Sequence, residues 1–159
     1  MTSRRPHNFP AHASPWGLTF LRAMIGVIMV MHGWQKLVVN GLAATADGFA
    51  SLGIPFATVA ATAAISIEIV AGAALFLGLA SRVSALLLGG TMVVALITVH
   101  LGNGFFASSG GYEYVLFLIV GCLTLALSGP GAAALDSTLR PQPAVRQTPL
   151  RTQMWAGSR

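Results

Sequence analysis

Apolar residues gather in four long blocks along the chain, separated by short stretches that are polar or rich in glycine. The blocks cover about residues 16–37, 55–79, 83–101 and 112–128. A helix rises about 1.5 Å per residue, so roughly 20 residues cross the ~30 Å hydrocarbon core of a bilayer. The pattern therefore predicts four membrane-spanning helices. Because the connections are short, we expect an all-α membrane protein, an antiparallel four-helix transmembrane bundle of up-down topology.

The segment between the first two blocks, residues 38–54, is too polar to cross a membrane. Its Phe49, Leu52 and Ile54 predict a short helix that lies along the membrane surface. A cleaved signal peptide is the competing interpretation, since residues 44–46 resemble a cleavage site. That interpretation is disfavoured because basic side chains interrupt the continuous apolar core that such a peptide needs: Arg22, His32 and Lys36.

The composition agrees with a membrane protein. Hydrophobic residues make up 55% of the 159 and charged residues only 8%, whereas soluble domains carry about 25% charged residues. The net charge of +5 does not indicate nucleic-acid binding, because the basic residues lie mainly in the two tails. The single cysteine, Cys122, excludes an intramolecular disulfide.

The charges and tails also predict domain organisation and orientation. We expect a disordered N-terminal tail over residues 1–15, a transmembrane domain over 16–129, and a basic, Pro-rich C-terminal tail over 130–159.

The Lys and Arg residues are distributed unequally between the two sides of the four-span arrangement, and Lys36 lies alone on one side. On the other side lie eight of the nine Lys and Arg residues: Arg4, Arg5, Arg22, Arg82, Arg140, Arg146, Arg151 and Arg159. The positive-inside rule then predicts that both termini are cytoplasmic.

Three of the basic side chains lie inside the first apolar block and share one face of its helix. At 100° per residue, Arg22, His32 and Lys36 fall within an arc of roughly 80°. A single polar stripe of this kind suits a helix whose charges face the interior of a bundle rather than lipid.

Depth in the membrane separates the ionisable residues into two groups. Arg22 and Glu68 both lie well inside their spans, where an unpaired charge costs about 2.5 to 3.5 kcal/mol. We therefore expect Arg22 and Glu68 to form a buried ion pair that fixes the helix register.

The second group lies within about 8 Å of the outer boundary and comes from three different spans. It contains His32, Lys36, His100 and Glu113. Ionisable residues that converge inside a membrane indicate function, so we predict a ligand pocket there, beneath residues 38–54. A quinone-like headgroup or a small acid would suit it, with histidine donating to a carbonyl oxygen, Lys36 supplying positive charge and Glu113 relaying protons.

Several short motifs occur in a recognisable order. They are R-x9-HGWQK from Arg22, E-x3-G from Glu68, GLASR before the third span, the histidine at position 100, GGYEY, and GPGAAALD. Together they resemble the DoxX family of small bacterial membrane proteins, over about residues 16–138. The resemblance implies a four-helix, multi-pass protein of the bacterial plasma membrane, related to the DoxD-like small subunit of thiosulfate:quinone oxidoreductase. The matching polar positions are Arg22, His32, Lys36, Glu68, His100, Glu113 and Asp136.

The family is linked to membrane-associated redox and stress-response complexes, so the resemblance implies a protein partner besides the lipid bilayer. The leading hypothesis is a redox-linked membrane subunit, with no established activity of its own. The alternative is a scaffold that docks a partner enzyme, in which the buried polar residues are structural. The paired cysteines of thiol-handling relatives are absent here. The state as monomer or homo-oligomer is left open.

Two metal-based alternatives are disfavoured. A b-type haem between His32 and His100 would need a glycine-lined slot, which the sequence does not indicate. A zinc site from His32, His100 and Glu113 lacks a close pair such as His-x3-His. We therefore predict no metal ligands, and the cofactor is left unknown, with a quinone as one candidate.

Overall fold

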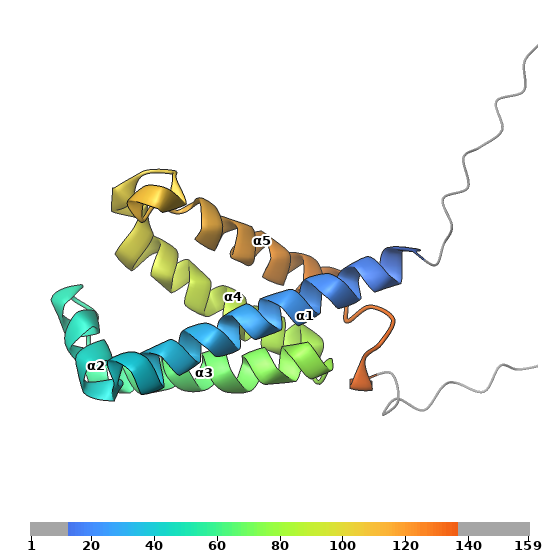
Figure 1. Ribbon diagram of the computed structural model, residues 1–159, viewed down its shortest axis with the longest axis horizontal. Helices are drawn as coiled ribbons and strands as arrows, with labels where there is room; N and C mark the ends of the chain where they lie inside the picture. Colours follow the sequence, from blue (N-terminus) through green and yellow to red (C-terminus); the bar gives the residue numbers. More distant parts are fainter. Residues whose placement is uncertain (1–12, 137–159) are drawn as a thin grey trace, which may run out of the picture.

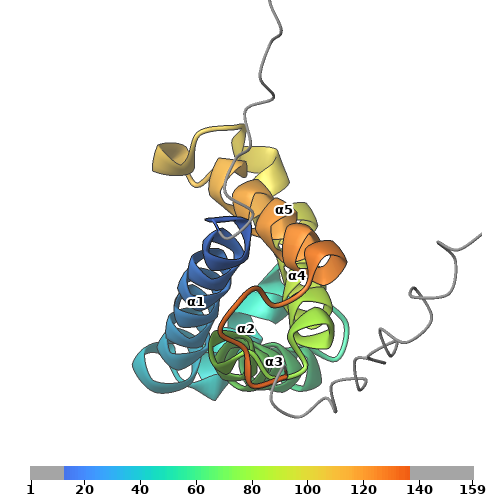
Figure 2. The same cartoon turned by 90° about the vertical axis from the view of Figure 1, so that its right-hand side faces the viewer.

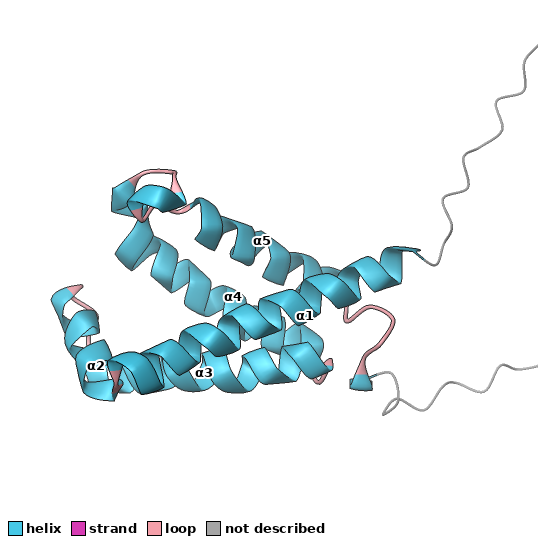
Figure 3. Ribbon diagram, in the orientation of Figure 1, coloured by secondary structure: helices cyan, strands magenta, loops and turns pink. Residues whose placement is uncertain are grey.

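The computed structural model describes residues 13–136, which form helices and short connections without any strand. The α-helices are α1 (Ala13–Trp34), the short α2 (Leu42–Ser51), α3 (Ala57–Leu77), α4 (Ser81–Ala95) and α5 (Glu113–Ser128). Two π-helical segments, η1 (Gln35–Asn40) and η2 (Leu96–His100), extend α1 and α4. Two 3-10 turns, η3 (Leu101–Asn103) and η4 (Ala107–Ser109), lie between η2 and α5. Figure 3 shows that most of residues 13–136 is helical and that the loops are short.

The predicted fold class is confirmed. Three continuous helical segments are long and apolar enough to cross a membrane: Pro15–Asn40, Ala57–Leu77 and Ser81–Asn103. The fourth, α5, is a shorter apolar helix of 16 residues. Helix α2 falls within the segment that was expected to form a short surface helix. Its Phe49 lines the pocket described below instead of facing only outward.

The four long helices form two pairs. Helix α1 packs along α3, and α4 packs along α5. The pairs lie close together at the end where α3 turns into α4, and they diverge toward the end that carries α2 (Figure 1). Figure 2, turned by 90°, shows α1 at the left, α4 and α5 at the right, and α3 below them. We call the diverging end the α2 end.

Glycine sets the register between α1 and α3. A Cβ atom added to Gly26 would lie 2.8 Å from the Gly72 carbonyl oxygen, and one on Gly33 would lie 3.1 Å from the Cβ atom of Glu68. Such close approach is typical of helices that pack in membranes. It places Glu68 level with Gly33, near the α2 end.

The core lies between the four long helices and consists of aliphatic side chains. The largest of those fully buried are Ile25, Met29, Leu75, Leu88, Leu118 and Leu125. Many large apolar side chains instead cover the outside, such as Phe20, Val59, Val70 and Leu127. This exposed apolar surface is the one that a bilayer covers.

Residues 129–136, GPGAAALD, fold back across the end opposite α2, and we call them the strap. The Ala132 amide donates to the Pro15 carbonyl at 3.1 Å, which ties the strap to α1. The Asp136 carboxylate accepts hydrogen bonds from the backbone amides of Ala80 at 2.8 Å and Ser81 at 3.0 Å, so it caps α4. Part of the expected C-terminal tail thus packs on the bundle, and the rest lies outside the described residues, as do residues 1–12.

Candidate functional site

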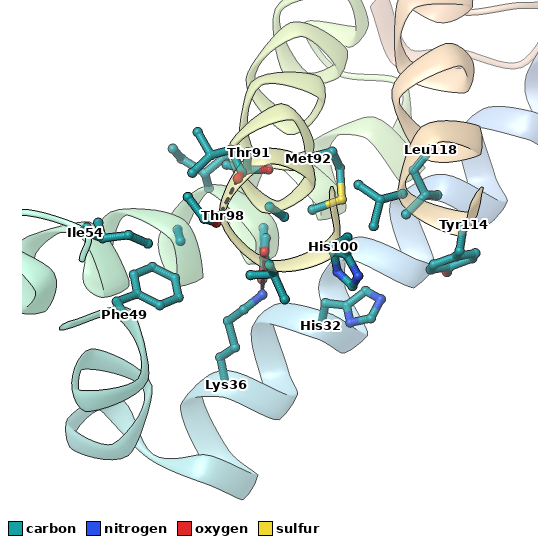
Figure 4. Close-up of a pocket in the computed structure, with 18 of the residues that line it drawn as sticks. His32, Lys36, Phe49, Ile54, Thr91, Met92, Thr98, His100, Tyr114 and Leu118 are labelled. Atoms are coloured by element: carbon teal, nitrogen blue, oxygen red, sulfur yellow. Dashed lines mark hydrogen bonds and ion pairs between the residues drawn. The ribbon is translucent and has the colours of Figure 1, made fainter. Parts of the chain in front are cut away.

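A cavity of about 550 Å³ lies between the helix pairs at the α2 end. This volume is within the range of ordinary small-molecule sites, about 300 to 1,000 Å³. Its walls come from α1 and η1, α2, α3, α4 and η2, the η4 region and α5 (Figure 4). Most of the lining is aliphatic. The polar and ionisable residues on the wall are His32, Lys36, Glu68, Thr91, Thr98, His100 and Tyr114.

An ion pair lies on the wall of this cavity. Lys36 Nζ is 2.6 Å from both Glu68 Oε1 and Glu68 Oε2. The Glu68 side chain is only 3% exposed, whereas that of Lys36 is 26% exposed. Because the ammonium and the carboxylate carry opposite charges, the pair adds no net charge to the pocket.

This pairing corrects the expectation that Glu68 would pair with Arg22. The register between α1 and α3 places Glu68 beside Gly33, while Arg22 lies beside Gly78, ten residues farther along. Ten residues of helix span about 15 Å, which is too far for an arginine side chain to bridge. Lys36, four residues from His32 on the same stripe, is the basic residue at the level of Glu68.

Arg22 is bound at the other end of the bundle. Its side chain is buried, with a residue exposure of 3%. Arg22 Nη1 donates to the Pro130 carbonyl at 3.1 Å, and Nη2 donates to the Ala133 carbonyl. The strap therefore supplies acceptors for both terminal nitrogens of a guanidinium buried in an apolar span, while Arg22 Nε has no hydrogen-bond partner within residues 15–136.

His32 and His100 both line the cavity, but they are held differently. The Nδ1 atom of His100 is 2.8 Å from the Gly110 carbonyl oxygen. A carbonyl can only accept, so Nδ1 carries the hydrogen and Nε2 of the neutral ring is an acceptor. The His32 ring lies 6.4 Å from the Tyr114 ring between centroids and has no hydrogen-bond partner within residues 15–136. Both of its nitrogens are therefore available to a ligand.

Glu113 does not line the cavity, although it was predicted to. Its Oε1 accepts a hydrogen bond from the Ala107 amide at 2.7 Å, and its own amide donates to the Phe105 carbonyl at 2.9 Å. These bonds close the connection between η2 and α5, which places Ala107, Gly110 and Gly111 on the cavity wall. Glu113 thus positions this wall and does not face a ligand.

The sequence matches the model of a known protein family. The DoxX family model matches residues 17–101, more than half of the chain. The chain belongs to the DoxX family.

Curated relatives agree with this membership. A Bacillus subtilis protein named "Putative oxidoreductase CatD" is 35% identical over 120 residues, which cover 76% of this chain and 84% of the relative. An uncharacterised Haemophilus influenzae protein is 34% identical, covering 77% of this chain and 90% of the relative. The uncharacterised membrane protein Rv3486 of Mycobacterium tuberculosis is 30% identical, covering 79% and 82%. No solved structure gives a significant match.

The motifs that suggested the DoxX family divide between the two ends of the bundle. HGWQK and E-x3-G bring His32, Lys36 and Glu68 to the cavity. Arg22 and GPGAAALD meet at the strap. Within residues 13–136, no group of three or more His, Cys, Asp or Glu side chains is arranged to hold a metal ion.

The sequence interpretation missed three polar wall residues besides Glu68. Thr91 and Thr98 are seven residues apart, so they share one face of a helix, and this spacing was a readable signal. Tyr114 is next to Glu113 in the sequence. Which of the two side chains faces the cavity depends on where α5 begins, and the structure places that beginning at Glu113.

Lys36 and His100 lie on the π-helical segments, which often occur at functional sites. The Thr45 hydroxyl donates to the Lys36 carbonyl at 3.0 Å and supports the first of them.

Proposed function

We propose that this DoxX-family protein is a membrane subunit of a redox system and that its cavity binds the headgroup of a quinone. The observation that carries this proposal is one cavity, among apolar spans, that holds a neutralised Lys36–Glu68 pair together with two histidines and a tyrosine. The name of the Bacillus relative favours a redox role.

The charge balance favours a neutral ligand over a small acid. Lys36 was expected to attract an anion, but its charge is matched by Glu68 at 2.6 Å. An acid entering the cavity would have to separate this pair or remain unpaired in an apolar wall, and both are costly. A quinone carries only carbonyl oxygens, which accept hydrogen bonds without bringing charge.

The histidines suit the proton chemistry of such a ligand. A quinone takes up two protons when it takes up two electrons. His100, held at Nδ1 by Gly110, would take up a proton at Nε2 and pass it to one reduced carbonyl oxygen. His32 would pass a second proton to the other oxygen in the same way, so that each ring returns to its neutral form. We propose that the two electrons are supplied by a redox protein bound to the subunit. We propose that this partner belongs to a redox or stress-response complex.

The orientation in the plasma membrane follows from charge. We propose that both termini are cytoplasmic and that the α2 end faces outward, since eight of nine Lys and Arg residues favour one side. Reporter fusions at residues 40 and 140 should report opposite compartments. The same compartment at both positions would contradict this orientation.

The binding proposal is tested with purified protein in lipid nanodiscs and a short-chain benzoquinone, by titration calorimetry. His32→Leu removes a polar group that faces the cavity and is expected to weaken binding at least about tenfold. Gln35→Leu is the matched control, because Gln35 is exposed, lies on the same helical segment and is not part of the cavity wall. It should bind like the natural sequence.

Stability separates the proposal from the scaffold alternative. His32 has no hydrogen-bond partner within residues 15–136, so His32→Leu should leave thermal stability unchanged or improved. If that variant unfolds, the role of His32 is structural, and the binding proposal loses its support. If the natural protein does not bind the quinone at all but still captures its partner, the scaffold function is the correct one.

A further inference from the structure

The cavity has two chemically different sides. Figure 4 shows His32, His100 and Tyr114 gathered on one side, while Phe49 and Ile54 lie on the opposite side. The space between them passes along α3 and α4. One side can hydrogen-bond a headgroup, and the other offers only apolar contact.

The α3 wall of this passage is a row of small residues. From Glu68 toward the start of the helix it continues through Ile67, Ala64, Ala63 and Ala60. These positions are spaced as one face of a helix, and the row is about 12 Å long. Alanine leaves open space beside the helix that a larger side chain would fill.

The facing α4 wall is less polar than its sequence suggests. The Thr98 hydroxyl donates to the Val94 carbonyl at 2.8 Å, and the Thr91 hydroxyl donates to the Leu88 carbonyl at 2.8 Å. Threonines that bond back to their own helix have no hydroxyl hydrogen left for a ligand. Their methyl groups, with Val94, make this wall suitable for a hydrocarbon chain.

The rim of the cavity lies at the level of the membrane-spanning segments. Ala63 and Val94 are exposed lining residues within the candidate spans Ala57–Leu77 and Ser81–Asn103. Val94 is 52% exposed. The η2–α5 connection, held by the Glu113–Ala107 and His100–Gly110 bonds, contributes Ala107 and Gly110 to the cavity wall. Exposed lining residues on both facing helices mark a lateral opening between α3 and α4 that a lipid-soluble molecule can enter from the bilayer.

We infer that the site takes a quinone with a hydrocarbon chain, and that this chain passes out between α3 and α4 along the Ala60–Ala63–Ala64 row into the bilayer. This inference rests on the proposed function. It adds the direction of access and the class of ligand, a membrane-dissolved prenyl quinone as opposed to a water-soluble one.

The test compares two benzoquinones with the same headgroup, one without a chain and one with a decyl chain, in nanodiscs of fixed lipid content. Ala63→Phe narrows the opening and is expected to weaken binding of the decyl quinone at least about tenfold, but that of the chainless quinone less than about threefold. Ala73→Phe places the same ring on an exposed position of α3 outside the cavity and should change neither. Equal loss for both quinones in Ala63→Phe would overturn the inference.

A direct readout uses a decyl quinone with a diazirine at the end of its chain, irradiated in the nanodisc and followed by peptide mass spectrometry. Adducts are expected on residues 57–64 and 93–99. Adducts confined to α1 and α5 would place the opening elsewhere and contradict the inference, even where the headgroup binds. Failure of the natural protein to bind the chainless quinone would instead contradict the proposed function itself.

Discussion

Arg22 and Lys36 lie on one stripe of the continuous helix that α1 and η1 form, but toward opposite ends of the bundle, and their charged groups are bound in different ways. Arg22 is enclosed, and its guanidinium donates to two carbonyls of the strap. Lys36 is bound by the Glu68 carboxylate on the wall of a cavity. The two residues looked equivalent in sequence, as basic residues inside an apolar span.

The difference shows how a buried cation can serve structure or function. At the strap end, two backbone carbonyls of the strap accept hydrogen bonds from the guanidinium. These bonds join α1 to the segment that caps α4. At the α2 end, a carboxylate neutralises the cation and space remains beside it. Only the second arrangement leaves a cavity beside the cation.

The largest expected effect comes from breaking the pair at the cavity. Lys36→Met should lower the free energy of unfolding by about 3–5 kcal/mol, because it leaves the buried Glu68 carboxylate without its partner. The double variant Lys36→Met/Glu68→Met should recover most of that loss, since apolar replacement of a buried pair is often neutral or stabilising. Unfolding in mixed micelles, followed by circular dichroism, measures both. A double variant as unstable as the two single variants summed would show that the residues are not coupled.

The sequence was sufficient to predict the fold and the inward face of α1. Apolar blocks separated by glycine and polar residues are a strong signal, and the four spans match α1, α3, α4 and α5 with their extensions. The arc shared by Arg22, His32 and Lys36 was also a sound guide: Arg22 is buried, and the other two line the cavity.

Contacts between residues that are far apart in the sequence could not be predicted. The Arg22–Glu68 pair was chosen from estimated depths, but the register depends on contacts such as Gly26 with Gly72. The acceptors of Arg22 lie 108 and 111 residues away in a strap that has no helical periodicity. Glu113 was misplaced because hydrogen bonds within a Gly- and Ser-rich connection fix its orientation, and helical geometry does not describe such a connection.

A smaller effect is expected at the strap. Arg22→Met leaves the Pro130 and Ala133 carbonyls without their donor and should cost about 2–3 kcal/mol of unfolding free energy. Quinone affinity should stay within about twofold, because the cavity is at the other end of the bundle. Arg82→Met is the matched control, an exposed cation near the same end, with an expected change within about 0.5 kcal/mol. A loss of quinone binding in Arg22→Met, with the fold intact, would mean that the two ends are not independent.

The smallest expected effect concerns a polar residue within the cavity itself. Thr98 lines the wall, so its hydroxyl could be taken for a ligand contact, yet it donates to the Val94 carbonyl of its own helix. Thr98→Val keeps the shape and removes the hydroxyl, and we expect a stability change within about 0.5 kcal/mol and an unchanged affinity for the decyl quinone. Thr62→Val is the matched control, because Thr62 makes the same bond to Thr58 on an exposed face outside the cavity. Calorimetry on both variants decides the question. If Thr98→Val alone weakens binding, the α4 wall offers the ligand a polar contact, and the passage between α3 and α4 is not the apolar channel that a hydrocarbon chain requires.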